Sequence, residues 1–231
     1  NIRIQAVTQE YCSQVIDHVT RVFLEHEPLL NTFPPCTTGA REREFRKLTE
    51  FFLKYNLSLM ALDGCTVVGC FINRPITRED IFCNDLDVFK SFEDEAVSQL
   101  EFLCNLVHQK LDLFSRFNVN KMFEGGYLSV EPSYGGKGLA TKLVRSGLEL
   151  GAQNNFLFAK ADTTSPVSAK VSMKAGMQEV YRVNYDEYKI DGNVVFKKTA
   201  KRPSHLTVVA CKLQKCEPYV LPVSSSTCPS N

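Results

Sequence analysis

The feature that most constrains this chain is a cluster of glycines, Gly135, Gly136 and Gly138, between an apolar run and a helical pattern. The run YLSV ends at Val130, and leucines recur at helical spacing over residues 139–150. A strand, a tight turn and a helix are therefore predicted in succession. The first turn of a helix has N–H groups without acceptors, and glycines let an anion approach them closely. The junction suits a phosphate or pyrophosphate, although glycines also shape tight connections that bind nothing.

Two classes of phosphate-binding turn lack a required residue here. A nucleotide P-loop needs GxxxxGK followed by Ser or Thr, whose hydroxyl binds magnesium, but Gly138 follows Lys137 and Thr141 comes too late. A dinucleotide turn needs a third glycine for close helix packing, but Leu139, Ala140 and Thr141 follow Gly138. The pyrophosphate of coenzyme A remains as the candidate ligand, beside the plain tight turn.

Length and composition predict one domain. The chain has 231 residues, of which 44% are hydrophobic and 23% charged, which is enough for one sizeable core and short for two. We expect residues 1–215 to form this domain and residues 216–231 to be a poorly ordered tail. A net charge of +1 offers no general attraction to nucleic acid or to an anionic membrane, so neither is expected as a partner. The oligomeric state is open, with a monomer favoured.

Membrane, targeting and metal-binding patterns are not evident in the sequence. No stretch approaches the roughly 20 apolar residues of a membrane span, and the start NIRIQAVTQEY lacks the apolar core of a signal peptide. We therefore expect a soluble, cytoplasmic protein. The nine cysteines are scattered and form no CxxC pair, so neither a disulfide framework nor a metal site is expected.

The chain alternates between strand-like and helix-like patterns, which predicts an α/β protein. Alternating and apolar runs predict strands at 2–7, on both sides of Asp63-Gly64 within 57–75, and at 125–132, 156–162, 177–190 and 205–213. Apolar residues at intervals of three or four predict helices at 15–27, 40–55, 91–117, 137–153 and 165–176. The strand, helix and strand over 125–162 predict a parallel crossover.

Three segments resemble the GCN5-related N-acetyltransferase (GNAT) superfamily: YLSV (127–130), SYGGKGLA (133–140) and SAKVSMKAGM (168–177). The resemblance covers residues 3–213 in the order of elements, and its specific part is the window 127–177. It implies an α/β (α+β) GNAT fold, with a mixed central sheet of about seven strands flanked by helices. HEPLLNTF (26–33) is in addition similar to the Glu-Pro-Leu motif of the insect-type arylalkylamine N-acetyltransferases, the group that includes dopamine N-acetyltransferase.

The resemblance implies acetyl-CoA as the acetyl donor, with its pyrophosphate on the turn and its pantetheine arm paired to the backbone of the preceding strand. Ser133 stands where the family often has Gln or Arg, so one side-chain contact to phosphate is in doubt, whereas backbone contacts survive the change. Lys137 could attract phosphate or simply be solvated. The expected cofactor-binding residues are Leu128, Ser129, Val130, Tyr134, Gly135, Gly136, Lys137, Gly138, Leu139, Ala140, Ser165 and Ser168.

Glu27 is the candidate general base. An alkylammonium of pKa near 10 is about three units from neutral at pH 7, a deficit of roughly 4 kcal/mol, so the reaction needs a proton acceptor. Glu27 lies four residues after Phe23 on an apolar helix stripe, where the helix dipole disfavours a negative charge. From its position alone, Glu27 would be a helix-end glutamate whose side chain bends into solvent. The match to the insect motif favours a catalytic role instead. Glu27, Pro28 and Tyr185 are the expected substrate-binding residues.

Thr164 and Ser168 fall where insect-type enzymes have two hydroxyls linked to catalysis. Ser172 occupies the position at which many superfamily members have a tyrosine that protonates the leaving coenzyme A thiolate. A proton relay through Thr164 and Ser168 is one interpretation. The other is helix capping by Thr164, Ser165 and Ser168, because their hydroxyls can accept from free N–H groups and Pro166 suits a first turn.

Together these features predict transfer of an acetyl group from acetyl-CoA to the primary amine of a small arylalkylamine, of the dopamine, serotonin or tryptamine class, by direct attack in a ternary complex. Two alternatives remain open. The acceptor could be another amine, such as a polyamine, a hydrazine-like amine or a protein lysine. The domain could also bind coenzyme A without catalysis, which Ser172 in place of the usual tyrosine suggests.

Overall fold

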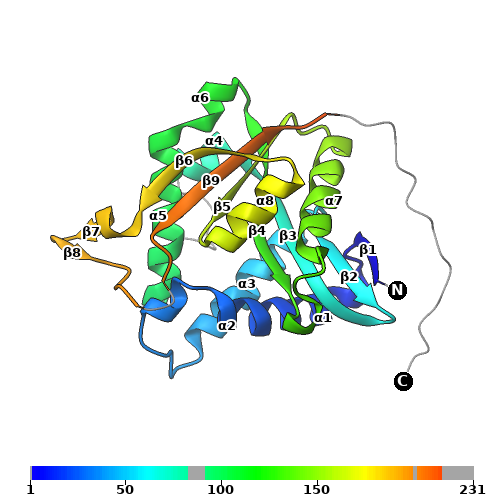
Figure 1. Cartoon of the computed structure of the whole chain (residues 1–231), viewed down its shortest axis with the longest axis horizontal. Helices are drawn as coiled ribbons and strands as arrows, with labels where there is room; N and C mark the ends of the chain where they lie inside the picture. The colour runs from blue at the N-terminus through cyan, green and yellow to red at the C-terminus, as the bar shows by residue number, and fades with distance from the viewer. Residues whose placement is uncertain (1, 83–91, 200–201, 215–231) are drawn as a thin grey trace.

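The computed structural model describes residues 2–82, 92–199 and 202–214. The expected tail at 216–231 and the domain boundary at 215 lie outside these residues. A seven-stranded mixed sheet with the order β1-β2-β3-β4-β5-β9-β6 forms the centre (Figure 1). Its strands are β1 (Ile2–Ala6), β2 (Leu59–Asp63), β3 (Thr66–Thr77), β4 (Lys121–Val130), β5 (Phe158–Thr163), β6 (Gln178–Asn184) and β9 (His205–Lys212). This confirms the expected α/β architecture and its sheet of about seven strands.

Strand pairing follows the predicted connections. β2 and β3 form an antiparallel hairpin, and Gly64 in its turn has a φ of +61°, in the left-handed region that glycine tolerates. β4 and β5 are a parallel pair joined by α7 (Leu139–Gln153), as the strand, helix and strand pattern predicts. The other neighbouring pairs of the sheet are antiparallel.

Helices cover both faces of the sheet (Figure 1). One face packs against α7 and α8 (Pro166–Ala175), and its core includes Phe123, Leu143 and Val209. The core on the other face includes Phe45 and Tyr127 and is covered by α1 (Cys12–His18), α3 (Ala40–Leu53) and α5 (Glu95–Leu111). The shorter helices are α2 (Leu24–His26), α4 (Arg78–Phe82) and α6 (Leu113–Phe117).

Two elements are shorter than the sequence predicts. The helix predicted at 91–117 is interrupted at Asp112, which has a φ of +35° and whose side chain accepts a hydrogen bond from the N–H of Ser115. The strand predicted at 177–190 ends at Asn184, whose side chain accepts from the N–H of Asp186. Short polar side chains satisfy the backbone locally at both places and so compete with the regular element. A small hairpin, β7 (Lys189–Ile190) and β8 (Asn193–Val194), follows.

The first predicted helix forms as α1, a π-helical segment (Val19–Phe23) and α2 in succession. Val15, Val19 and Val22 are buried along it, as the apolar stripe predicts. The N–H of Glu27 donates to the carbonyl of Phe23 at 2.8 Å, and Glu27 itself has an extended backbone with φ −72° and ψ 112°. The chain therefore leaves the helix at Glu27.

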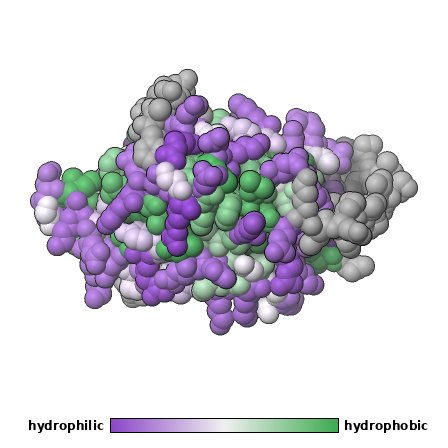
Figure 2. Space-filling model, turned by 90° about the horizontal axis from the view of Figure 1, so that it is seen from above, coloured by the Kyte–Doolittle hydropathy of each residue, from purple (hydrophilic) through white to green (hydrophobic). Residues whose placement is uncertain are grey.

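The described part of the chain contains no helix that is long and apolar enough to cross a membrane. Seen from above in Figure 2, hydrophilic residues cover most of the face and hydrophobic residues gather toward its middle. The near balance of 27 basic and 26 acidic residues accords with this mixed surface.

Candidate active site

Two neighbouring strands separate in the middle of the sheet. β4 and β5 pair only over Phe123–Gly125 and Ala159–Ala161, whereas β4 continues to Val130 and β5 to Thr163. Beyond the last pair, the edge of β4 that faces β5 has no strand partner in the described sheet. An extended ligand can pair with such an edge as a further strand would. Three residues that were expected to contact the cofactor arm line this opening: Leu128, Ser129 and Val130.

The glycine turn lies between the end of β4 and the start of α7. Gly136 and Gly138 have φ values of +72° and +79°, which residues with a Cβ rarely adopt, and Gly138 is the N-cap of α7. A Cβ on either glycine would meet nothing within 4 Å, so open space adjoins the turn. The N–H groups at the start of α7 therefore border an exposed surface, which fits a pyrophosphate.

Two side chains of the turn contact their surroundings. The Tyr134 hydroxyl donates to Asp63 Oδ2 at 2.7 Å, which ties the turn to the β2–β3 hairpin. The Nζ of Lys137 donates to the carbonyl of Ser133 at 3.2 Å, and the side chain stays exposed. The expected cofactor residues 128–130 and 134–140 thus form one strip from β4 to α7.

Glu27 lies at the end of α2 and is buried, with 4% of its surface exposed. Its Oε1 accepts a hydrogen bond from the N–H of Leu29 at 3.0 Å, and its Oε2 accepts one from the hydroxyl of Thr164 at 2.8 Å. Burial raises the pKa of Glu27 to about 7, although both hydrogen bonds favour the ionised form. Both protonation states of this carboxyl are therefore populated near neutral pH.

Thr164 is the predicted hydroxyl that reaches Glu27. Its carbonyl accepts a hydrogen bond from the hydroxyl of Tyr185 at 2.9 Å. Tyr185, which was expected to bind the acceptor, is fully buried and is not among the residues that line the cavity beside Glu27. In this structure Tyr185 holds Thr164 in place.

Ser165 and Ser168 form the capping box of α8, with Pro166 in its first turn. Ser165 Oγ accepts from the N–H of Ser168 at 3.1 Å, and Ser168 Oγ accepts from the N–H of Ser165 at 3.2 Å. The Ser168 hydroxyl donates to the carbonyl of Ser165 at 2.9 Å. Capping therefore accounts for both hydroxyls. Ser165 and Ser168 also line the cavity, and their expected contact with the cofactor stays a prediction.

Glu27 and Pro28 line a cavity of about 860 Å³ that adjoins the separated strands. Part of its wall is aromatic: the rings of Phe23 and Tyr127 have centroids 5.2 Å apart, and Phe52 stacks on Tyr127 at the same distance. Aromatic side chains bury large apolar surfaces and pack well against another ring. The cavity is therefore suited to an amine with an aromatic or aliphatic body.

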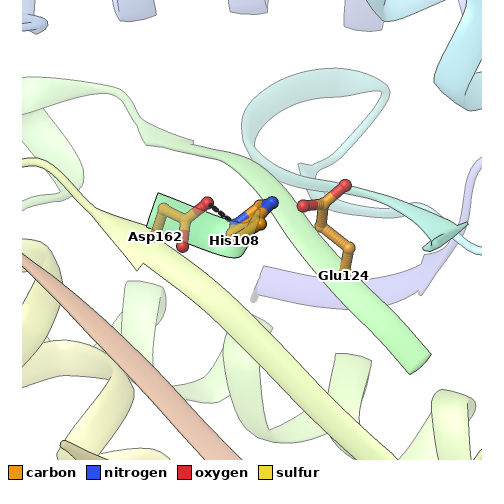
Figure 3. Close-up of side chains that lie close together, drawn as sticks. All are labelled: His108, Glu124 and Asp162. Atoms are coloured by element: carbon orange, nitrogen blue, oxygen red, sulfur yellow. Dashed lines mark hydrogen bonds and ion pairs between the residues drawn. The ribbon is translucent and has the colours of Figure 1, made fainter. Parts of the chain in front are cut away.

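A charge cluster, which the sequence did not predict, adjoins the same cavity, and four of its five members line it. In Figure 3, His108 of α5 lies between Asp162 of β5 and Glu124 of β4. His108 Nε2 is 2.6 Å from Asp162 Oδ2, and Arg74 Nε donates to Glu124 Oε2 at 2.6 Å. Lys160 Nζ donates to Asp162 Oδ2 at 2.9 Å and also contacts Glu124 and His108. We call these five residues the charge cluster.

The charge cluster is an ion-pair network. Burial alone would raise the pKa of Glu124, but the charges of Arg74 and Lys160 outweigh it and lower this pKa to about 2. His108 and Lys160 likewise lower the pKa of Asp162 despite its burial. The side chains of His108, Glu124 and Asp162 are close enough to hold a metal ion, with ligand atoms within 4.8 Å of one another. The ammonium of Lys160 contacts all three, so this chain places its own cation there.

Sequence reasoning missed the charge cluster because its members come from β3, β4, β5 and α5. One signal for it exists in the segment FLFAKADT, where Lys160 and Asp162 alternate with small apolar residues. Residues two apart in a strand point to the same face, so two charges fall on one side of an otherwise apolar strand. Such a pair indicates that other charged residues lie buried against this face, but it does not identify them.

Comparison with known proteins gives the same fold. No protein-family model matches the chain. Arylalkylamine N-acetyltransferase 2 from Aedes aegypti is 26% identical, and the match covers 93% of this chain and 100% of that chain with a TM-score of 0.79. The putative arylalkylamine N-acetyltransferase 7 from the same mosquito is 20% identical, and the match covers 92% of this chain and 88% of that chain with a TM-score of 0.80. A polyamine N-acetyltransferase of Drosophila melanogaster, which forms N-acetylagmatine, is 17% identical. The match covers 92% of this chain and 100% of that chain with a TM-score of 0.78.

The separated strands, the glycine turn at a helix N-terminus and these likenesses agree with one another. The chain has the GNAT fold, which it shares with insect arylalkylamine N-acetyltransferases, and these likenesses support an acetyl-CoA-dependent N-acetyltransferase.

Proposed function

We propose that this enzyme acetylates the primary amine of a small arylalkylamine, of the dopamine, serotonin or tryptamine class, by direct attack in a ternary complex with Glu27 as the general base. The observation that carries the proposal is the buried Glu27 carboxyl, which lines the cavity and has a pKa of about 7. The likeness to arylalkylamine N-acetyltransferase 2 and the aromatic wall of the cavity support this acceptor class.

The residues that would hold acetyl-CoA are those of the strip from β4 to α7. The start of α7 would bind the pyrophosphate, and the backbone of β4 beyond Gly126 would pair with the pantetheine arm. Acetyl-CoA supplies the acetyl thioester. Ser168 is the proposed cofactor contact from α8, because it lines the same cavity.

Glu27 is proposed to take the proton that the ammonium must lose before it can attack. Deprotonating an alkylammonium in solution at pH 7 costs roughly 4 kcal/mol. A base placed within reach of the proton lowers this cost. Thr164 orients the carboxylate through its 2.8 Å hydrogen bond, and the fully buried Tyr185 orients Thr164. In the predicted hydroxyl relay, Thr164 is therefore the member in contact with the base.

The variant Glu27→Gln tests the base. We expect kcat/KM for tryptamine or dopamine to fall by about 10²- to 10⁴-fold, because an amide does not accept the proton. Acetyl-CoA binding, measured by calorimetry, should stay within about twofold. Glu25→Gln is the matched control, since Glu25 is exposed two residues away. An activity loss in Glu27→Gln below twofold would contradict the assignment.

A stability measurement separates loss of the base from loss of the fold. Because the folded state raises the pKa of Glu27 from 4.5 to about 7, the stability linked to this group is present below about pH 4.5 and lost as pH rises through 7. The glutamine variant does not undergo this ionisation, and its amide oxygen can still accept a hydrogen bond, as the Glu27 carboxylate does from Leu29 and Thr164. It should therefore unfold at the same or a higher temperature than the native protein at pH 8.

Two rival functions are distinguished by the acceptors that turn over. A free-thiol release assay with arylalkylamines, a polyamine and a lysine peptide reports which acceptor class is used. Tight acetyl-CoA binding with no thiol release for any amine would instead indicate a coenzyme A-binding module without catalysis.

A further inference from the structure

A further carboxyl, outside the charge cluster, lines the acceptor cavity, and nothing in the proposed reaction uses it. Glu101 of α5 is half-buried, and it is among the residues that line the cavity. Its Oε1 accepts a long hydrogen bond of 3.4 Å from the hydroxyl of Tyr127. No residue in the described part of the chain forms a salt bridge with Glu101.

The neighbouring acidic groups, in contrast, have strong partners. Glu124 pairs with Arg74 and Lys160, and Asp162 pairs with Lys160 and His108. The two permanent cations of the charge cluster therefore balance its two carboxylates. Glu101 is an additional carboxyl that these two cations do not neutralise. Burial raises its pKa to about 7, although the nearby charge of Arg74 favours ionisation.

The aromatic wall links Glu101 to the reacting end of the cavity. Phe23 lies one helical turn before Glu27, its ring contacts that of Tyr127, and the Tyr127 hydroxyl donates to Glu101. An acceptor that places its amine at Glu27 and its body on this wall would direct its remote end toward Glu101. A remote apolar group there would leave a carboxyl desolvated without a new partner, which costs binding free energy.

We infer that Glu101 selects acceptors whose remote end donates hydrogen bonds, either a ring hydroxyl or a second cationic nitrogen. This inference rests on the proposed function and names the acceptors that the same site prefers. The shared chemistry is a donor that pairs with the carboxylate at the end of the aromatic wall. Glu101 is thus a specificity residue, and acetyl transfer itself does not require it.

The test compares amines that differ only at the remote end. The pairs are tyramine with phenethylamine, and 1,5-diaminopentane with pentylamine. For the native enzyme we expect kcat/KM to be at least tenfold higher for the donor-bearing member of one pair. In Glu101→Leu that ratio should fall by tenfold or more, while the amine without the donor stays within threefold. Glu95→Gln, at an exposed position on the same helix, is the matched control.

The variant Glu101→Gln identifies which donor is recognised. Its amide oxygen still accepts from a hydroxyl, so the tyramine ratio should be largely kept, but it has no charge for a cation, so the diaminopentane ratio should collapse. The thermal midpoint of Glu101→Leu should be equal to or above that of the native protein, because a half-buried carboxyl without an ionic partner is removed.

Three results would overturn the inference. They are unchanged ratios in Glu101→Leu, a proportional loss for all four amines with a lower thermal midpoint, and a native enzyme that does not distinguish the members of either pair. A failure of the proposed function looks different: the native enzyme would then release no thiol even with phenethylamine, which needs no contact at Glu101.

Discussion

Glu27 illustrates how the surroundings of one side chain decide its chemistry. A glutamate in solvent has a pKa near 4 and is mostly unable to hold a proton at neutral pH, whereas burial raises the pKa of Glu27 to about 7. The N–H of Leu29 and the hydroxyl of Thr164 oppose this rise because they bond to the carboxylate. If Glu27 is the base, kcat/KM should fall as pH drops through about 7, because a protonated carboxyl cannot take the proton of the substrate ammonium.

The hydroxyl of Thr164 provides a test of this pH dependence. Thr164→Val removes the donor and keeps the shape, so the pKa of Glu27 should rise and the acidic limb of the pH profile should move upward by about one unit. Thr164→Ser keeps the hydroxyl and is the control. The measurement is kcat/KM for one amine from pH 5 to 9. An identical limb in Thr164→Val and the native enzyme would mean that Glu27 does not set it.

The glycine turn shows the same dependence of function on local structure for a whole element. The left-handed φ values of Gly136 and Gly138 let the chain turn sharply enough to place the start of α7 beside the end of β4. The turn is exposed, and a Cβ on Gly136 or Gly138 would meet no protein atom within 4 Å, which accords with the proposed pyrophosphate site.

Substitution of one glycine should separate ligand binding from backbone strain. Gly138 and Gly192 share a φ of +79°, and a Cβ on either would meet no protein atom within 4 Å. Alanine should therefore cost each about 1 to 2 kcal/mol of unfolding free energy. Gly138→Ala should in addition raise KM for acetyl-CoA about tenfold, and Gly192→Ala should change it less than twofold. Equal KM values in the two variants would place the pyrophosphate elsewhere.

For the molecule as a whole, the charge cluster joins β3, β4, β5 and α5 directly below the point where β4 and β5 separate. Arg74, Glu124 and Lys160 are buried there, and Glu124 and Lys160 are paired residues of β4 and β5. The partly exposed Asp162 lies one residue beyond the last pair. Removing one partner from such a network leaves an uncompensated buried charge, which is more costly than replacing the whole pair. The cluster therefore ties the long helix to the base of the opening.

Lys160 is the residue whose loss should affect the whole fold. Lys160→Met should lower the free energy of unfolding at pH 7 by about 3 to 5 kcal/mol, because Glu124 and Asp162 lose their shared cation. Since the folded state lowers the pKa of Glu124 to about 2, the stability from this pairing is present above about pH 4.5 and lost as pH falls through 2.

Urea unfolding at several pH values checks both parts of this prediction. The gap between Lys160→Met and the native protein should be largest at pH 7 and should narrow below about pH 4.5. Lys212→Met on β9, where the lysine is exposed, should change the unfolding free energy by less than about 0.5 kcal/mol. A variant at 160 as stable as the one at 212 would contradict the ion-pair network.

The predictions from sequence were most successful where the information is local. The hairpin at Asp63-Gly64, the parallel β4–α7–β5 unit and the buried stripe that ends at Glu27 all depend on neighbouring residues, and the structure contains each of them. The break at Asp112 was missed because an apolar stripe continues on both sides of it. Periodicity does not register a single side chain that bonds to the backbone three residues on.

The sequence by itself determined the pieces of this protein: a turn that only glycine permits, helices with one apolar side, and a glutamate at the end of one of them. Only the tertiary structure decided that Thr164 donates a hydrogen bond to Glu27, 137 positions away in the chain, and that Tyr185 donates one to Thr164. It also decided that Lys160 forms ion pairs with both Glu124 and Asp162. The reason is physical. Backbone conformation follows from residues near in sequence, whereas the pKa of a carboxyl and its partners depend on which distant groups exclude water from it.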